Sequence, residues 1–451
     1  MGILSRILNR APAAPAVQTR RFDGATGGRR GFGMGTFGRI NPEIAAAGPQ
    51  LRSRAAYLAQ NNPWVAHAVA NWTGALVGSG IMPVSRHPDA ATRAALNAYF
   101  RDWTDSADAE GRTDFEGLQT SIAQSLVVTG EGLALIVDSD EGPKLRVLPV
   151  ELLDESKTAD LSSDRFIFSG VEMDGNGRRL AYHILPERPA SVFVTYAPAQ
   201  RIDAASVLHV VKPSAPGQIR GASWLAPIIL SASDFDQYAD ALLMSAKVAA
   251  MHSGFIVNMN GAGTDPYDGA DTPSMEPGTL VRLGMGDDVK FNSPAQLQQA
   301  DAFLKHNLRQ LAAGLGLPDH LVSGDLSGAN YSSLRAGLLP FRQRVEQIQY
   351  GVLVPQFLGP IWRAVIEDGV LSGRIDAPDF EQNPRAYLSA DWLPPKPLQV
   401  DPAKDVEATR AELELGLTSR RKAVAERGWA LEDLDAEIAA ERPLEQKDSK
   451  E

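Results

Sequence analysis

Cysteine is absent from the 451 residues of the chain. This absence excludes disulfides, metal sites built from thiolates and cysteine nucleophiles, and it fits a reducing compartment. The dipeptide Gly-Lys is also missing, so there is no phosphate-binding loop of the usual form. Neither HExxH nor GxSxG occurs, and the seven histidines never lie four residues apart. The sequence therefore predicts no metal, no cofactor and no catalytic residues.

A long hydrophobic run is missing as well. Residues 55–85 carry no charged side chain, but Asn, Pro, His and Gly residues interrupt the segment. A membrane span needs about 20 consecutive, mainly apolar residues. A buried helix that runs into a Gly-rich turn is therefore favoured, and we expect no membrane partner.

Positive charge is scarce and unevenly placed. The chain has 44 Lys and Arg against 55 Asp and Glu, which gives a net charge of -11. Residues 1–60 hold nine Arg and two acids, whereas residues 401–451 hold fourteen acids and nine bases. Tight wrapping of nucleic acid needs many cation–phosphate contacts, so the acidic balance argues against it. A channel through which DNA slides stays compatible, because strong binding there would stop movement.

Periodicity and capping residues predict an α+β fold. Residues 1–50 are rich in Gly and Arg and are expected to form a flexible basic arm. Helices are expected at 55–76, 90–104 and 115–128. A section of short strands follows, expected at 133–137, 144–150, 165–171, 179–185, 192–196 and 207–211. Asp174-Gly-Asn-Gly177 between two of these runs favours a tight hairpin.

Two long helices are expected at 228–251 and 295–315. They flank a loop-rich module, 254–294, in which 279–283 is expected to pair with 289–291. Farther along, a helix over 352–366 is expected to be kinked or interrupted at its prolines. The proline-rich segment 392–402 favours a stiff linker, and three short helices are expected in the acidic tail that follows.

The stretch 316–350 reads GLPDHLVSGDLSGANYSSLRAGLLPFRQRVEQIQY. An apolar helix ends in Gly-Leu-Pro, a loop of small polar residues follows, and a second helix begins. Apolar residues of the second helix recur in steps of four and three, so they share one stripe: Leu334, Leu338, Phe341, Val345 and Ile348. The residues alone leave open a simple corner between two helices of a large enzyme.

The run GDLSGANYSSLRAGLL, residues 324–339, resembles the signature of the lambda-type phage portal protein family. Other stretches are similar to the same family: NNPW at 61–64 with GSG at 78–80, DF at 114–115 with GE at 130–131, the Asp174-Gly hairpin with AYH at 181–183, and PGQIRGASWLAP at 216–227. The resemblance covers about residues 55–440 and is strongest at 216–227 and 316–355.

The resemblance implies a portal-type, ring-forming fold with a wing of helices and small strands, two stem helices flanking a clip, and a helical crown. The implied parts are an arm (1–50), wing (51–227), first stem helix (228–253), clip (254–294), second stem helix (295–316), tunnel loop (317–333), channel helix with the remaining wing (334–400) and acidic crown (401–451).

The resemblance also implies a structural rather than an enzymatic role. About twelve identical subunits would form a ring at one capsid vertex of the virion, after assembly in the host cytoplasm. Double-stranded DNA would be packaged and ejected through the ring. Terminase would dock at the clip, head–tail connector proteins would follow it, and major capsid or scaffold proteins would surround the ring.

Side chains facing the DNA channel are expected on the tunnel loop and beside it. The loop candidates are Ser323, Asp325, Ser327 and Asn330, and the further candidates are Lys305, Arg309 and Arg335. Helix caps and hydrogen bonds between subunits are an equal alternative for each of them. Two other function classes stay open: another virion subunit, such as an adaptor or tail protein, and an enzyme acting on nucleic acid, whose acids or histidines would converge only on folding.

Overall fold

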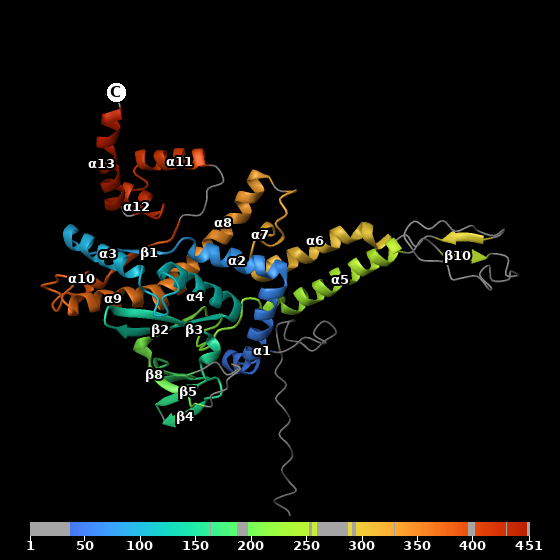
Figure 1. Cartoon of the computed structure of the whole chain (residues 1–451), viewed down its shortest axis with the longest axis horizontal. Helices are drawn as coiled ribbons and strands as arrows, with labels where there is room; N and C mark the ends of the chain where they lie inside the picture. Colours follow the sequence, from blue (N-terminus) through green and yellow to red (C-terminus); the bar gives the residue numbers. More distant parts are fainter. Residues whose placement is uncertain are drawn as a thin grey trace, which may run out of the picture.

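The computed structural model describes residues 37–162, 164–186, 197–251, 255–258, 287–290, 295–328, 330–395, 402–429 and 431–448. It has a mixed helix and sheet architecture, as the sequence predicts. Figure 1 shows a helical body with small sheets on one side, a helical hairpin that projects from it, and C-terminal helices set apart from its core.

The body begins with two helices, α1 (Ile40–Asn61) and α2 (Pro63–Val77). The break between them has a local cause: Asn62 caps α2 by accepting a hydrogen bond of 2.9 Å from the backbone N–H of Val65, and Pro63 occupies the first helical position. The single helix expected over 55–76 is therefore wrong.

Helix α1 also begins earlier than the sequence suggests. Its first residues fall inside the range expected for a flexible arm, 1–50, and Ile44 is buried there. Burial of apolar side chains offsets the cost of ordering the backbone, so this part is helical. The predicted boundary of the arm, at residue 50, therefore lies inside α1, which begins at Ile40. Residues 1–36 lie outside the described residues.

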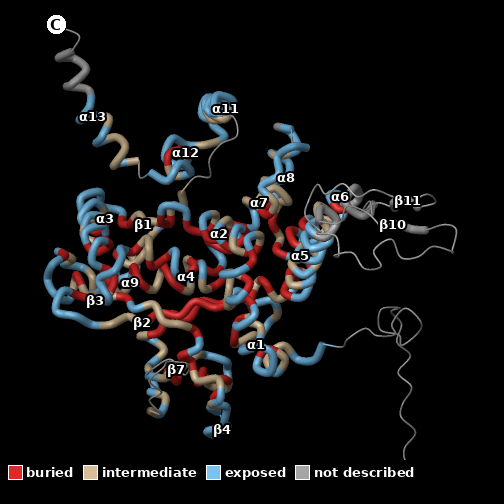
Figure 2. Tube along the Cα trace, turned by 45° about the vertical axis from the view of Figure 1, so that its right-hand side comes forward, coloured by how far each residue is buried: buried red, intermediate tan, exposed pale blue. Residues whose placement is uncertain are grey.

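Helices α3 (Ala90–Thr104) and α4 (Phe115–Thr129) confirm the predicted pair. Asp114 caps α4 by accepting a hydrogen bond of 2.8 Å from the N–H of Gly117. Helices α2 and α4 contribute Trp72, Leu76, Ile122 and Leu126 to the main core. Figure 2 shows buried residues concentrated along these central helices and the adjoining strands.

Two larger antiparallel sheets lie in the body. The three-stranded sheet has the order β3-β2-β9, with β2 (Glu131–Ser139), β3 (Gly142–Leu148) and β9 (Val207–Val211). The five-stranded sheet follows chain order from β4 to β8, with β4 (Ala159–Ser162), β5 (Arg165–Phe168), β6 (Val171–Asp174), β7 (Arg179–Ile184) and β8 (Gln200–Asp203).

The five-stranded sheet departs from the predicted strands at one turn. The run 165–171 was expected as one strand, but a turn at Ser169 and Gly170, both with positive φ, divides it between β5 and β6. The hairpin expected at residues 174–177 joins β6 to β7, with Gly177 at φ 83°. The strand expected at 192–196 lies outside the described residues.

Helices α5 (Ile229–Met251) and α6 (Ala295–Leu315) form the projecting hairpin and agree with the predicted long helices. The ring centroids of Tyr238 and Phe303 lie 4.8 Å apart between them. Strand β10 (Phe255–Asn258) pairs with β11 (Asp287–Lys290). The expected strand near 289–291 is thus present, but its partner is β10, while 279–283 lies outside the described residues.

The chain then returns to the body through α7 (His320–Ser323), α8 (Tyr331–Ile348) and a π-helix (Gln349–Leu358) that leads into α9 (Gly359–Leu371). Pro355 lies inside the π-helix, and Pro360 lies in the first turn of α9. Both prolines fall where the helix geometry changes, in agreement with the expected interruption. Helix α10 (Pro384–Leu388) precedes β12 (Ala390–Leu393), which pairs with β1 (Met82–Ser85).

The C-terminal helices are α11 (Pro402–Glu414), α12 (Arg420–Ala425) and α13 (Leu431–Asp448). Ion pairs connect α13 to α3: Arg93 lies 3.1 Å from Glu432, and Arg101 lies 2.7 Å from Asp433. The segment 396–401 of the expected stiff linker lies outside the described residues.

Candidate functional site

The loop between α6 and α8 begins with a backbone geometry that ends α6 sharply. Gly316 has φ 69°, its N–H donates to the carbonyl of Ala313, and the N–H of Leu317 donates to Ala312. This pattern is a Schellman motif, in which glycine supplies the left-handed residue that other residues adopt only at a cost. The side chain of Arg344 on α8 donates a hydrogen bond to the carbonyl of Gly316 and closes the turn.

The base of the loop is anchored to the central helix α2. The indole N–H of Trp72 donates to the carbonyl of Leu315 at 3.1 Å, and the amide of Asn71 donates to the carbonyl of Leu321 at 2.8 Å. Trp72 is buried, and its ring contacts Phe341 of α8 edge to face at 5.1 Å. The loop is therefore fixed at its base to the core of the body.

Each of the four predicted loop residues has a local hydrogen-bonding role. The hydroxyl of Ser323 donates to the carbonyl of Asp319 at 3.0 Å and accepts the N–H of Asp325 at 3.1 Å. The carboxylate of Asp325 accepts the N–H of Ser327 at 2.8 Å, which forms an Asx turn. Asn330 caps α8 in a reciprocal capping box with Ser333. Asp325, Ser327 and Asn330 are exposed.

Two of the three predicted cations lie close to this loop. The ammonium of Lys305 is 3.1 Å from Asp301 and 3.9 Å from Asp325. The hydrogen bond and charge of Asp301, supported by Asp325, raise the pKa of Lys305. The guanidinium of Arg309 lies 3.5 Å from Asp319.

Asp325 has a lowered pKa because of its hydrogen bonds with Ser327 and the nearby charge of Lys305. The carboxylate is therefore anionic at neutral pH, and the loop carries one negative charge beside one positive charge. Arg335 is exposed on α8, and no ion pair joins it to the other described candidates. The third cation is thus not part of the same cluster.

The predicted apolar stripe of α8 divides into two parts. Phe341, Val345 and Ile348 are buried, whereas Leu334 and Leu338 are half-buried and Leu339 is 56% exposed. Figure 2 shows the first turns of α8 standing clear of the body. The second half of the helix therefore packs on the core and supports the first half.

A second feature, which the sequence reasoning missed, is a buried ion network centred on Glu131 and Arg220. The guanidinium of Arg220 makes three hydrogen bonds of 2.8–3.1 Å to the carboxylate of Glu131 and one of 2.9 Å to the carbonyl of Ser169. Arg220 also lies 3.1 Å from Glu155, which in turn pairs with Arg52 of α1. The network ties α1, β2 and the five-stranded sheet together.

Two glycines allow this network to form. An added Cβ at Gly130 would lie 2.2 Å from the backbone of Ala222, and one at Gly221 would lie 2.1 Å from the carbonyl of Gly130. Only residues without a Cβ permit the two backbone segments to approach so closely. Both glycines stand next to the paired residues, in the two stretches 130–131 and 216–227 that resemble the portal family.

The charges of this network are fixed at neutral pH. Burial would raise the pKa of Glu131, but Arg220 and His209 hold it well below its usual range. Burial lowers the pKa of His209 to about 4, although Glu131 lies 3.6 Å away and opposes that shift. His209 is therefore neutral at pH 7, and Arg220 is the compensating cation for Glu131.

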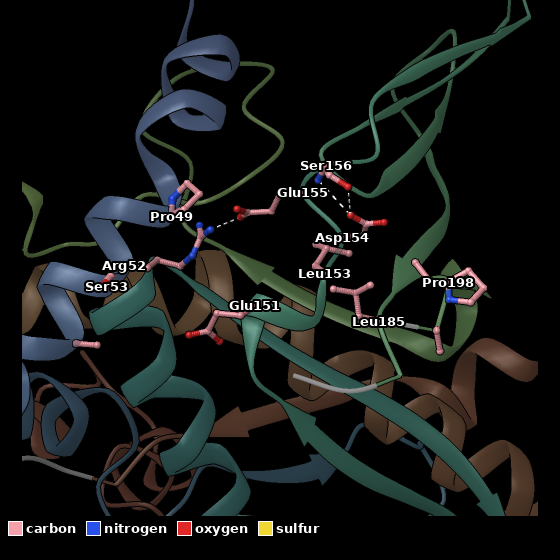
Figure 3. A pocket seen from close by; sticks show the side chains of 13 residues that line it. Pro49, Arg52, Ser53, Glu151, Leu153, Asp154, Glu155, Ser156, Leu185 and Pro198 are labelled. Atoms are coloured by element: carbon pink, nitrogen blue, oxygen red, sulfur yellow. Dashed lines mark hydrogen bonds and ion pairs between the residues drawn. The ribbon is translucent and has the colours of Figure 1, made fainter. Parts of the chain in front are cut away.

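A pocket with a volume of about 880 Å³ lies between α1 and the five-stranded sheet. Figure 3 shows Arg52 reaching from α1 toward Glu155 across one wall, with Leu153 and Leu185 farther along. Its acids are already used within the chain: Glu155 pairs with Arg52, and Asp154 accepts two hydrogen bonds from Ser156. These contacts hold the carboxylates of Asp154 and Glu155 on partners within the chain.

Within the described residues, no group of three or more His, Asp or Glu side chains could hold a metal ion. A search of the same residues finds no helix that is long and apolar enough to cross a membrane.

The comparisons with known proteins decide the family. The model of the family "Phage portal protein, lambda family" matches residues 34–349 of the chain. The chain belongs to the lambda family of phage portal proteins. This confirms the resemblance carried by the loop signature, and a phage portal protein is the function that the family assigns.

Curated relatives carry the same description. The chain is 25% identical to the portal protein of Escherichia phage N15, over 94% of this chain and 90% of the relative. It is 22% identical to portal protein B of Escherichia phage lambda, over the same shares. The probable portal protein of Halomonas phage phiHAP-1 is 25% identical, over 76% of this chain and 68% of the relative.

Solved structures resemble this chain with low TM-scores. The neck of an empty GTA particle matches with a TM-score of 0.45 and 17% identity, over 86% of this chain and 94% of that chain. The HK97 family phage portal protein from Corynebacterium diphtheriae matches with a TM-score of 0.30 and 14% identity, over 79% of this chain and 98% of that chain.

Proposed function

We propose that this portal protein forms a ring of about twelve identical subunits at the portal vertex of a virion, after assembly in the host cytoplasm, and that double-stranded DNA passes through the ring. The wing is the helical body with its sheets, the stem is the α5–α6 hairpin, and α11 to α13 are the crown. Terminase docks at the clip around β10 and β11 during packaging, head–tail connector proteins follow it, and major capsid or scaffold proteins surround the ring.

The loop over 317–333 narrows the channel in this proposal. The observation that carries it is the way the loop is built: Trp72 and Asn71 fix its base to the core, while Asp325 and Ser327 are exposed at its tip. A loop of this kind keeps its shape and projects polar groups away from the body. Its hydrogen bonds to its own backbone leave few free donors that would hold a phosphate.

The same loop supports passage rather than tight binding of DNA. Asp325 carries a negative charge close to Lys305, at 3.9 Å, so the local charge is balanced. Because phosphate contacts supply most of the nonspecific affinity for DNA, a balanced loop adds little of it. Membership of the portal family favours this function over an adaptor or tail subunit and over an enzyme acting on nucleic acid.

Electron microscopy of the purified protein tests the ring directly. The expected result is rings with a central hole at least as wide as a DNA duplex. A protein that stays monomeric at high concentration, also in the presence of its scaffold, would contradict the proposal.

Shortening the loop tests the channel. Deletion of residues 325–328 removes the tip but keeps Asn330 as the cap of α8. Rings are expected to form as in the unchanged protein, whereas particles should package or retain less DNA. The matched control is the double substitution Asp325→Asn and Ser327→Ala, which keeps the loop length. Failure of the deletion variant to form rings would mean that the loop has a structural role instead.

A further inference from the structure

A cavity of about 520 Å³ lies where the three-stranded sheet meets β7 and the helical segment that follows α8. A volume of this size is typical of a site for a small ligand. The cavity shares no lining residue with the pocket beside Arg52 or with the loop over 317–333. Its polar lining comes from segments distant in the chain: Arg179, Tyr182, His209, Gln356, Arg363 and Glu367.

The helical wall of this cavity is fixed to the sheet by one side chain. Gln356 of the π-helix accepts a hydrogen bond of 2.8 Å from the N–H of Val211 and donates one of 3.0 Å to the carbonyl of the same residue. The amide therefore satisfies the outer edge of β9 in the way that a further strand would. π-helical turns are rare and occur often at functional sites. The π-helix leads directly into α9, so it sets the position of Arg363 and Glu367.

Two guanidinium groups from different elements line the cavity. Arg179 of β7 is half-buried, and it donates a hydrogen bond of 3.1 Å to the carbonyl of His209 and another to the hydroxyl oxygen of Tyr182. Arg363 of α9 is exposed. Neither arginine forms an ion pair with an acid in the described part of the chain. Because a guanidinium has several N–H donors, both arginines keep donors for a ligand.

The balance of charge in the cavity is positive. Glu367 is the one acid among the described residues that line it, and His209 is neutral at pH 7. Arg363 and Glu367 lie four positions apart on α9, but no ion pair joins them. The cavity thus combines two cations with one anion, in a chain whose net charge is -11. Such a site attracts an anionic ligand.

We propose that this cavity binds inorganic phosphate between Arg179 and Arg363, with Glu367 accepting a hydrogen bond from the oxygen that carries a proton. One guanidinium is enough to hold a planar carboxylate, whereas two from different elements suit an ion with two charges and oxygens in several directions. Near neutral pH phosphate keeps a proton that it can donate to a carboxylate. Sulfate has no such proton, so its oxygens meet the like charge of Glu367. The inference does not depend on the ring proposed above.

A bound phosphate ion connects two parts of the body. Arg179 belongs to the five-stranded sheet and Arg363 to the helix that follows the π-helix. Without an anion, the two like charges share one cavity and repel each other. A ligand that binds only the folded chain raises its stability by mass action. Phosphate is therefore expected to stabilise the contact between the sheet and α9.

Calorimetric titration of the full chain with sodium phosphate, at constant ionic strength, tests the site. The expected result is saturable binding of one ion per chain. Arg363→Gln removes one guanidinium at an exposed position, so the dissociation constant should rise about tenfold or more. The matched control is Arg385→Gln, which makes the same change of charge at an exposed position of α10 outside the cavity and should leave the constant unchanged. Absence of saturable binding, or equal constants for Arg363→Gln and the unchanged chain, would overturn the site.

Two other anions test the role of Glu367. Sulfate carries no proton, and a phosphate monoester such as glycerol 3-phosphate has a second pKa of about 6, so it is mostly without its proton at neutral pH. Both should bind more weakly than inorganic phosphate, by about tenfold. In Glu367→Gln this difference should disappear, because an amide can donate to all three ions. Equal binding of the three ions by the unchanged chain would overturn the assignment of phosphate as the ligand.

Thermal unfolding separates this site from a general effect of salt. Phosphate and sulfate stabilise proteins through exclusion from their surface, and that effect is the same in Arg363→Gln and Arg385→Gln. Binding adds a second effect at low phosphate concentration. Phosphate should then raise the Tm of the unchanged chain and of Arg385→Gln by more than that of Arg363→Gln. Equal shifts in all three proteins would show exclusion alone and would overturn the proposal.

Discussion

Glu131 and Arg220 face each other in a bidentate arrangement, with three N–H···O contacts of 2.8–3.1 Å and with both side chains almost fully buried. Breaking such a pair leaves an uncompensated charge in the interior, which is far more costly than losing an exposed pair. The pair also joins β2 to the segment before α5, so its loss should affect the whole body.

Substitution Arg220→Met tests this relationship. We expect the free energy of unfolding to fall by about 3–5 kcal/mol, because Glu131 loses its cation while it stays buried. Urea denaturation followed by circular dichroism measures the change. The matched control is Arg101→Met, which removes an exposed pair with Asp433 and should cost less than about 1 kcal/mol. A similar cost for both variants would show that the buried network contributes no more than a surface pair.

Two glycines, one at the end of α6 and one at the end of α7, have the same backbone conformation. Gly316 and Gly324 both have φ 69°, but an added Cβ at Gly316 would lie 2.2 Å from Arg344, whereas nothing lies within 4 Å at Gly324. Gly324→Ala should cost about 1–2 kcal/mol for the left-handed conformation alone. Gly316→Ala should cost more, because Arg344 must also give up its hydrogen bond to that turn. Denaturation curves of the two variants provide the comparison, and equal costs would mean that Arg344 moves away freely.

Stability should depend on pH through His209. Burial lowers its pKa to about 4, against 6.5 for the unperturbed group, so the unfolded chain binds a proton more readily than the folded one. The folded state is therefore stabilised above about pH 6.5 and loses up to roughly 3 kcal/mol as the pH falls to about 4.

Denaturation at pH 7 and at pH 5 measures this dependence. In His209→Asn the difference between the two pH values should shrink, whereas His67→Asn, at an exposed position, should leave it unchanged. An unaltered pH dependence in His209→Asn would assign the effect to other groups, such as the acids of the network.

Hydrogen exchange measures how firmly the loop between α6 and α8 is anchored. Asn71→Ala removes the hydrogen bond of 2.8 Å to the carbonyl of Leu321, and we expect faster exchange of the amides of 320–328 by about fivefold, for a loss of about 1 kcal/mol. Asn61→Ala removes a similar bond within α1, to the carbonyl of Tyr57, and should leave the loop unchanged. Unchanged exchange in Asn71→Ala would place the anchor in Trp72 alone.

Periodicity and capping predicted most helices of the body and the projecting hairpin, because these elements depend on residues close together in the chain. The break at Asn62 was missed even though Pro63 marks it, since the apolar pattern continues across it. The early start of α1 was missed because its contacts are distant in sequence: Asn41 donates a hydrogen bond to the carbonyl of Gly217 and accepts one from the N–H of Ile219. The turn at Ser169 was missed because serine seldom adopts a positive φ, so the residue type does not indicate a turn there.

The loop candidates were found by their composition and by resemblance. Hydrogen bonds link Ser323 to Asp325 and Asp325 to Ser327, whereas Asn330 bonds to Ser333 at the start of α8. Their anchors, Asn71 and Trp72, lie more than 200 residues away in sequence, and no local pattern connects them. The pairing of Glu131 with Arg220 could likewise not be predicted, because the two residues lie 89 positions apart. The one available signal was that both lie in short stretches similar to the portal family, each next to a glycine.

Ion pairs join the C-terminal helices to the body. Between α13 and α3, Arg101 and Asp433 form an exposed ion pair, and the half-buried Arg93 pairs with the exposed Glu432. No residue of α11 is buried. Electrostatic attraction of this kind has a range of about 10 Å at 0.1 M salt and fades as salt rises. A rise in the ionic strength of the surroundings therefore weakens the attachment of the C-terminal helices to the body.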